Sequence, residues 1–348
     1  GHEVAVQSGA GASASIRDED FAAAGATVVP DAAGTWEFGD LVLKVKEPVP
    51  AEYPLLREGQ TLFTYLHLAA DKRLTEELLR RKVTAVAYET VELPDRTLPL
   101  LAPMSEIAGR LAPQVGAHTL MSAQGGRGVL LGGVSGVYSA RVVVIGAGVA
   151  GMNAAAMAIG MHADVVLMDR DISRLRQADL LYRGRCKTVM SNGYEIERAV
   201  TEADLVIGSV LLPGARTPRL VSNELVARMK PGSVLVDISI DQGGCFASSR
   251  PTTHADPVFR VHDTLFYCVT NMPGAVSHTS TYALTNVTVP YALALADLGW
   301  HAAMRADRAL ALGLATHDGA LVSAPVAEAH GLAHTPLEDV LGATPQWG

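Results

Sequence analysis

Residues 141–169 read RVVVIGAGVAGMNAAAMAIGMHADVVLMD. The stretch begins with a β-branched run typical of a buried parallel strand, and the glycines that follow lead into an Ala-rich run typical of a helix. A second apolar run ends at Asp169, 18 positions after Gly151. This order of strand, glycine-rich turn, helix, strand and terminal acid predicts the first βαβ unit of a doubly wound α/β fold.

The three glycines of this GxGxxG pattern have separate spatial roles. Gly146 permits the tight turn, Gly148 lets the backbone approach a pyrophosphate, and Gly151 lets the helix pack closely on the sheet. The helix that begins near Val149 offers free N–H groups to the phosphates. Asp169 can accept hydrogen bonds from a ribose and would repel a 2′-phosphate, which predicts NAD rather than NADP. A glycine-rich turn without a ligand is the alternative interpretation.

The second half of the chain continues this alternation. Strands are predicted at residues 186–190, 204–209, 233–239 and 265–270, and a helix at 172–181. With the two strands of the opening stretch, this gives six strands, the full number of a doubly wound dinucleotide-binding sheet.

The first hundred residues contain a second set of apolar runs and helical patterns. Strands are predicted at residues 3–7, 41–46, 61–67 and 83–89, and helices at 17–25 and 75–82. Such alternation implies βαβ units and a parallel sheet. We therefore predict a protein of the α/β class with two Rossmann-like domains and parallel sheets.

Two long helical patterns, at residues 103–121 and 277–298, separate the two regions. We expect these helices to pair and to join an NAD-binding domain at 104–271 to a catalytic domain made of 1–103 and 272–348. The tail after the second long helix is expected to hold short helices that fold back on the first domain.

The composition excludes several classes of partner. With 348 residues and a formal net charge of −8, the chain offers no basic surface to nucleic acid or to an anionic membrane. No run approaches the ~18 apolar residues that span a bilayer. Cys186, Cys245 and Cys268 lack CxxC spacing, which favours buried thiols in a protein of the reducing cytoplasm. No metal site is expected.

Three titratable side chains follow predicted strands. Lys46, His67 and Asp241 each stand at a carboxyl end, where open α/β sheets bind their ligands. We therefore predict that they converge on one cleft between the domains. Taken singly, each has a plainer interpretation: a solvated lysine, a structural histidine and a turn-forming aspartate.

These residue types suit the oxidation of an amino acid. A histidine can move protons near neutral pH, and a lysine supplies a fixed positive charge for a carboxylate or carbonyl. A carboxylate can stabilise an ammonium group or orient the water that attacks an imine. The hydride chemistry would belong to the cofactor.

Five further runs stand out in the sequence: residues 44–48 (KVKEP), 100–106 (LLAPMSE), 125–128 (GGRG), 236–244 (VDISIDQGG) and 271–276 (NMPGAV). These runs resemble the bacterial L-alanine dehydrogenase family, and the likeness covers essentially the whole chain. The NAD-binding subunit of nicotinamide nucleotide transhydrogenase shares part of this pattern.

The resemblance implies a cytoplasmic, hexameric enzyme that interconverts L-alanine with pyruvate and ammonia using NAD. It implies that Lys46 binds the substrate carboxylate or carbonyl, that His67 is the acid/base, and that Asp241 completes the catalytic group. Asn271 is implied as a substrate and nicotinamide-side contact. The implied cofactor contacts are Ser105, Gly146, Gly148, Val149, Gly151, Asp169, Arg174, Ser191, Val210, Leu211, Asp241, Asn271 and Met272.

One departure from the family concerns the start of the chain. Family members begin with a strand and an E-x-x-R-V type segment whose arginine holds the substrate carboxylate, whereas this sequence opens at Gly1 in a strand-like run. We expect a strand–helix unit to be missing. Losing that contact would cost about 1.5–3 kcal/mol, so we expect the chain as written to be poorly active.

Two other functions remain open at this stage. A transhydrogenase subunit would deliver hydride to a partner protein and would have no obvious use for His67 beside Lys46. A non-catalytic nucleotide-binding or assembly protein would fit the departure at the start of the chain. NADH production from L-alanine separates the dehydrogenase from both alternatives.

Overall fold

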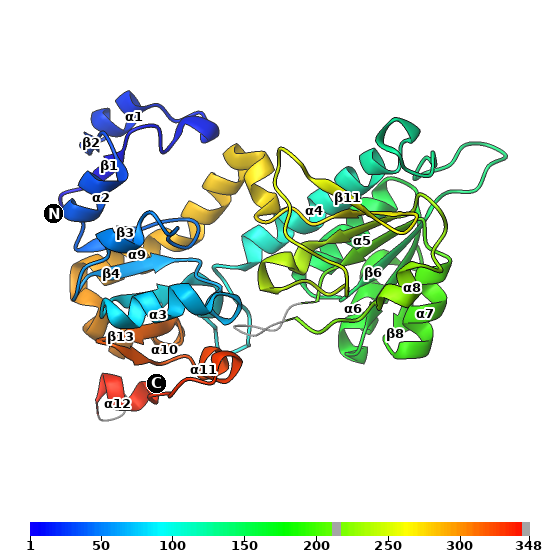
Figure 1. The fold of residues 1–348 in the computed structure, drawn as a ribbon. Helices are drawn as coiled ribbons and strands as arrows, with labels where there is room; N and C mark the ends of the chain where they lie inside the picture. The colour runs from blue at the N-terminus through cyan, green and yellow to red at the C-terminus, as the bar shows by residue number, and fades with distance from the viewer. Residues whose placement is uncertain (211–216, 343–348) are drawn as a thin grey trace. The chain divides into compact units, whose positions relative to one another are not determined.

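The computed structural model describes residues 1–210 and 217–342, which form two compact units (Figure 1). Within these residues, unit 1 contains 1–103 and 276–342, and unit 2 contains 104–210 and 217–275. Both are α/β units with mainly parallel sheets, so the predicted fold class is confirmed. None of the described helices is long and apolar enough to cross a membrane.

The described part of unit 2 contains a seven-stranded sheet of order β11-β12-β10-β9-β6-β7-β8. Six of these strands are parallel, and their order is that of the doubly wound dinucleotide fold. The strands are β6 (Arg141–Ile145), β7 (Asp164–Asp169), β8 (Lys187–Met190), β9 (Leu205–Gly208), β10 (Val234–Asp237), β11 (Val258–Val261) and β12 (Thr264–Tyr267).

The seventh strand, β11, corrects the expectation of a purely parallel sheet. It pairs antiparallel with β12 through a tight turn at His262, which has a left-handed backbone. Its four residues are mostly half-buried because it lies at the sheet edge. Such a short edge strand has too little hydrophobic pattern to stand out from a loop.

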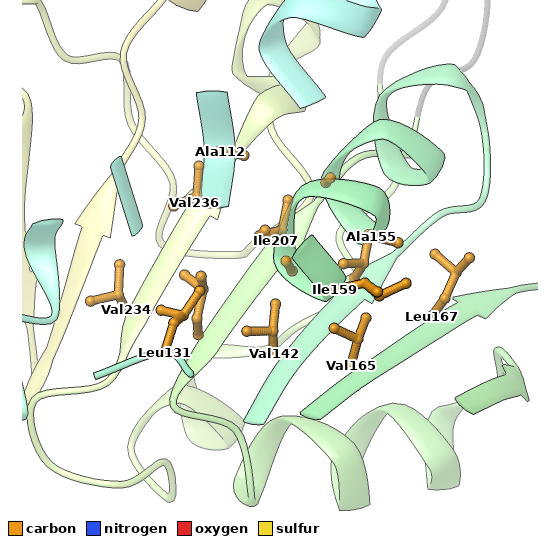
Figure 2. Packing of buried hydrophobic residues seen from close by; sticks show 14 of the residues in the cluster. Ala112, Leu131, Val142, Ala155, Ile159, Val165, Leu167, Ile207, Val234 and Val236 are labelled. Atoms are coloured by element: carbon orange, nitrogen blue, oxygen red, sulfur yellow. The ribbon is translucent and has the colours of Figure 1, made fainter. Parts of the chain in front are cut away.

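Buried side chains explain why β6 reads as an unbroken β-branched run. Val142 and Val144 join the core on one face of the sheet, and Val143 and Ile145 join the core on the other. Figure 2 shows Val142 near Ala155 and Ile159 in the first of these cores. Because both faces are buried, alternation of polar and apolar residues is absent, as parallel sheets require.

The helices of unit 2 begin at residues that suit a helix start. The side chains of Asp171, Asn192 and Ser222 each accept a hydrogen bond from a backbone N–H of the turn that follows them. Gly109 packs against the backbone of Ala150, where a Cβ atom would overlap the carbonyl oxygen. The helices are α4 (Ala102–Thr119), α5 (Val149–Gly160), α6 (Ile172–Tyr182), α7 (Gly193–Thr201) and α8 (Asn223–Val226).

The described part of unit 1 contains a five-stranded sheet of order β14-β13-β5-β4-β3 and a separate parallel pair, β1 with β2. The strands are β1 (Ala5–Gln7), β2 (Thr27–Val29), β3 (Leu41–Leu43), β4 (Thr61–Thr64), β5 (Thr84–Ala87), β13 (Leu314–His317) and β14 (Ala320–Leu321). The helices are α1 (Asp18–Ala23), α2 (Ala32–Phe38), α3 (Lys72–Arg80), α9 (Ser277–Ala306), α10 (Arg308–Ala311), α11 (Ala324–His330) and α12 (Leu337–Leu341).

The end of the chain corrects a second expectation. The tail contains short helices, as predicted, but it also supplies β13, which pairs antiparallel with β5, and β14, which pairs with β13. The long helix α9 is broken at Gly299, whose φ of 73° and ψ of 157° are not helical. This break falls one residue after the predicted helix end at Leu298.

The three cysteines are free thiols, and all three are buried. Burial raises the pKa of Cys186 to about 11 and that of Cys268 to about 12. These thiols are therefore protonated at neutral pH and behave as small apolar groups.

Glu52 gives the first testable prediction. Its buried carboxylate accepts hydrogen bonds from Lys44 Nζ at 2.6 Å, Val49 N at 2.9 Å and Trp36 Nε1 at 3.2 Å. Burial opposes ionisation, but these donors outweigh it and lower the pKa of Glu52. The stabilisation is therefore present above the unfolded pKa of about 4.3 and is lost as pH falls through the folded pKa.

We expect Glu52→Gln to lower the free energy of unfolding by about 1–3 kcal/mol at pH 7, and by less below pH ~4. Urea unfolding followed by circular dichroism across this pH range measures the difference. Glu58→Gln is the control, because the Glu58–Lys82 pair is exposed and contributes little. A constant difference at all pH values would contradict the assignment.

Candidate active site

The predicted cofactor residues of unit 2 follow the carboxyl ends of its parallel strands. The strand β6 lies between β7 and β9, where the order of the strands along the chain reverses. Ligands of doubly wound sheets bind at such a switch point. The residues that end or follow these strands are Gly146 after β6, Asp169 at the end of β7, Ser191 after β8, Val210 after β9, Asp241 after β10, and Asn271 with Met272 after β12.

Two glycines of the loop, Gly146 and Gly151, have the geometry predicted from the sequence. Gly146 has a φ of 108°, which favours glycine, and a Cβ atom at Gly151 would overlap the Gly146 carbonyl oxygen. Gly148 precedes α5, and a Cβ atom there would meet only Arg174 Nη1, 3.8 Å away, among the described atoms. The loop therefore packs tightly at Gly146 and Gly151, whereas Gly148 has space for a Cβ atom among the described atoms.

Asp169 is fixed at the end of β7 by backbone donors. Its Oδ2 accepts from Ala147 N at 2.6 Å, and its Oδ1 accepts from Asp171 N at 2.8 Å. The exposed Arg174 lies 3.8 Å from Oδ2. Each carboxylate oxygen can accept a further hydrogen bond, so these contacts are compatible with a bound ribose.

The other residues predicted to contact the cofactor differ in their surroundings. Ser105 lies in the first turn of α4, Val210 is partly exposed directly after Ser209, and Met272 is buried. Leu211 lies outside the described residues. Among the residues that the structure describes, no group of three or more His, Cys, Asp or Glu side chains is placed to hold a metal ion.

Asp241 and Asn271 meet because β10 and β12 are neighbours in the sheet. Asp241 lies in a 3-10 turn, Ile238–Gln242, and its Oδ2 accepts from Asn271 N at 3.3 Å. Asn271 has a φ of 55°, and its carbonyl oxygen lies 3.2 Å from His254 Nε2. Unit 2 thus places a carboxylate beside an amide at the edge that carries the glycine loop.

In unit 1, Lys46 and His67 follow neighbouring parallel strands rather than ending them. The strand β3 stops at Leu43 and β4 stops at Thr64, so both predicted strand ends were too late. Thr64 Oγ1 donates to the carbonyl oxygen of Lys46 at 3.1 Å and ties the two segments together. Lys46 Nζ lies 3.5 Å from Glu47 Oε2.

His67 has two features that are uncommon in a structural histidine. Its backbone is left-handed, with a φ of 49° and a ψ of 36°. Its Nδ1 is buried and meets no hydrogen-bond partner within residues 1–210 and 217–342. Since buried polar atoms nearly always have a partner, this nitrogen is free to bond a group other than the described residues.

Two residues that the sequence did not single out hold His67. Glu89 Oε1 accepts from His67 N at 2.6 Å, and both Glu89 oxygens accept from Leu66 N at 3.2 Å. The Tyr65 ring is nearly parallel to the His67 imidazole, at 6.0 Å between centroids. Glu89 ends the predicted strand 83–89, so the rule that selected Lys46 could also have selected it.

The fold, with candidate site residues after the carboxyl ends of its parallel strands, defines a two-unit α/β protein of Rossmann-like architecture. The alanine dehydrogenase/PNT N-terminal domain family matches residues 1–108, and the corresponding C-terminal domain family matches residues 112–324. The chain belongs to the alanine dehydrogenase/PNT family, which confirms the family predicted from its sequence.

Named relatives agree with this placement. The alanine dehydrogenase of Mycobacterium tuberculosis (strain CDC 1551 / Oshkosh) is 62% identical over 98% of the chain and 92% of the relative. That of Halomonas elongata is 54% identical over the same shares. A solved L-alanine dehydrogenase is 51% identical, with a TM-score of 0.86 over 95% of this chain and 91% of that one. The transhydrogenase structure from Sinorhizobium meliloti is more distant, at 25% identity and a TM-score of 0.73 over 93% and 91%.

Proposed function

We propose that this chain catalyses the NAD-dependent, reversible oxidative deamination of L-alanine to pyruvate and ammonia. The observation that carries the proposal is the buried Nδ1 of His67, which has no hydrogen-bond partner among the residues that the structure describes, on a segment next to that of Lys46. The relatives named alanine dehydrogenase, at 50% identity or more over nearly the whole chain, support this reaction.

NAD is the proposed cofactor, held by unit 2, with residues 104–271 as the NAD-binding domain. The open side of Gly148 and the N-terminus of α5 would receive the pyrophosphate, and Asp169 would bind the adenosine ribose. Asn271 and Met272 would contact the nicotinamide side. When bound, NAD would supply the acceptor for the hydride that leaves the substrate carbon.

The side chains of the proposed catalytic domain, residues 1–103 with 272–348, bind and deprotonate the substrate. Lys46 would pair with its carboxylate or carbonyl, and His67 would take a proton from the ammonium group or from attacking water. Asp241 would stabilise the ammonium group or orient that water. We further propose a cytoplasmic homohexamer, by likeness to the family.

The substrate and cofactor together form the second testable prediction. We expect NADH formation with L-alanine, and a kcat/KM for NAD about 100-fold above that for NADP, because the Asp169 carboxylate would repel a 2′-phosphate. Near-ultraviolet absorbance with L-alanine, glycine, L-serine and 2-aminobutyrate measures turnover and specificity. Hydride exchange between NADH and an NADP analogue, without turnover of any amino acid, would instead favour the transhydrogenase function.

A further inference from the structure

Asp237, the last residue of β10, is a buried carboxylate that the proposed reaction does not use. Its side chain is 0% exposed, and no ion pair involves it in the described part of the chain. Burial raises its pKa. Burying a carboxylate without a paired cation costs free energy unless hydrogen-bond donors compensate for the lost water. The donors to Asp237 therefore indicate its structural role.

The donors to Asp237 come from both ends of one loop, residues 238–244. Its Oδ1 accepts from Ser239 N at 3.0 Å, where the loop begins. Its Oδ2 accepts from Cys245 N at 2.9 Å, where the loop ends, and from Ser249 Oγ just beyond. The carboxylate therefore clamps the loop closed across its base.

The glycines of the loop fit this clamp. Gly243 and Gly244 have φ values of 94° and 78°, which allow the chain to turn back. A Cβ atom at Gly244 would lie 2.6 Å from Asp237 Oδ2. Gly244 N also donates to the Ser239 carbonyl oxygen at 3.0 Å. The loop closes directly on the carboxylate, with no room for a side chain between them.

The clamped loop reaches three positions of the proposed site. It carries Asp241, whose carboxylate accepts from Asn271 N, and Ser239 Oγ donates to the Val210 carbonyl oxygen at 2.6 Å. A shift of this loop would therefore move Asp241 relative to Asn271 and Val210.

We propose that Asp237 is a positioning residue that holds Asp241 in its working geometry. This inference rests on the proposed function, because it assigns Asp241 to the reaction. A role in folding alone would predict loss of stability without a specific loss of turnover, and the two roles can be separated by experiment.

The test compares Asp237→Asn with Asp204→Asn. Asp204 is a matched control: it is 6% exposed, precedes β9 in the same sheet, and holds Arg127 Nε at 3.0 Å and Lys230 Nζ at 3.1 Å at the opposite end of the strands. In Asp237→Asn, one carboxylate oxygen becomes an NH₂ group facing N–H and O–H donors, so the clamp opens. Ser249→Ala is a milder variant that removes a single donor.

We expect kcat for L-alanine oxidation to fall at least about 30-fold in Asp237→Asn and several-fold in Ser249→Ala. KM for L-alanine should change by less than about threefold, because Lys46 belongs to unit 1. Asp204→Asn should keep kcat within about twofold of the original protein, even if its melting temperature falls as much as that of Asp237→Asn. Equal loss of kcat in Asp237→Asn and Asp204→Asn at equal stability would overturn the proposal.

Amide hydrogen exchange of the loop provides a readout that needs no turnover. Exchange at Ser239 and Cys245 should accelerate at least about tenfold in Asp237→Asn and stay unchanged in Asp204→Asn. If the original protein does not oxidise L-alanine, the proposed function fails, whereas faster exchange would still support the clamp. Unchanged exchange in Asp237→Asn would overturn the clamp whatever the activity.

Discussion

His67→Asn should lower kcat for L-alanine oxidation by about 10²–10⁴-fold, the range that positioned acid–base groups contribute. Asparagine is the suitable replacement because it tolerates the left-handed backbone that His67 adopts, whereas alanine would add strain. The variant removes the imidazole and leaves the Glu89 contact to the backbone N–H in place. Steady-state NADH formation measures the effect, and the free energy of unfolding should change by less than about 1 kcal/mol.

His317→Ala is the matched control for this variant. His317 also belongs to unit 1 and is half-buried, but its Nδ1 lies 2.9 Å from Thr84 Oγ1 and its ring lies 4.2 Å from that of Trp300. Both contacts explain His317 as a structural residue. Its removal should lower stability and leave kcat per folded molecule nearly unchanged. Near-normal turnover in His67→Asn would refute the acid–base assignment.

Part of the candidate site could be predicted from the sequence. Position after a strand identified Lys46, His67 and Asp241, since parallel strands bring their carboxyl ends to one edge. Glu89 ends a predicted strand and could have been selected by the same rule, but its contact with the His67 N–H depends on how the loops fold, which residue spacing does not encode. Asp237 was missed because it lies inside the predicted strand 233–239 and acts through backbone N–H groups that follow it.

The same physical reasons separate the confirmed elements from the missed ones. The strands β6, β7, β9 and β10 were predicted because both of their faces are buried, which leaves long β-branched runs. The elements β2, α2 and β11 were missed because few of their side chains are buried, so their sequences lack the continuous apolar run of the central strands. The strands β13 and β14 were missed because their sequences, LATH and AL, contain no run of β-branched residues.

The glycine loop allows folding and cofactor binding to be tested separately. Gly151→Ala should lower the free energy of unfolding by about 3 kcal/mol, because its methyl group would overlap the Gly146 carbonyl oxygen and crowd Ser209 Oγ at 2.7 Å. The overlapping atom belongs to the backbone of a tight turn and cannot rotate away. Urea unfolding measures this loss, and α5 should separate from the sheet before the rest of unit 2 unfolds.

Gly148→Ala should have the opposite pair of effects. Its φ of −76° accommodates alanine, and its Cβ atom would meet only the end of Arg174 among the described atoms, so stability should change by less than about 1 kcal/mol. The methyl group would stand where the pyrophosphate approaches the backbone. Calorimetric titration should then show NAD binding weakened by about 100-fold, the size of a lost charge-assisted contact.

Gly160→Ala completes the series as a control at the other end of α5. A Cβ atom there has nothing within 4 Å among the described atoms, so this variant should gain up to ~1 kcal/mol from helix propensity and bind NAD unchanged. Gly160→Ala should be the most stable of the three variants, Gly148→Ala intermediate and Gly151→Ala the least stable. NAD affinity should be lost selectively in Gly148→Ala. If Gly148→Ala bound NAD as tightly as Gly160→Ala, the loop would be a structural turn, and the cofactor would have to bind elsewhere on the sheet edge.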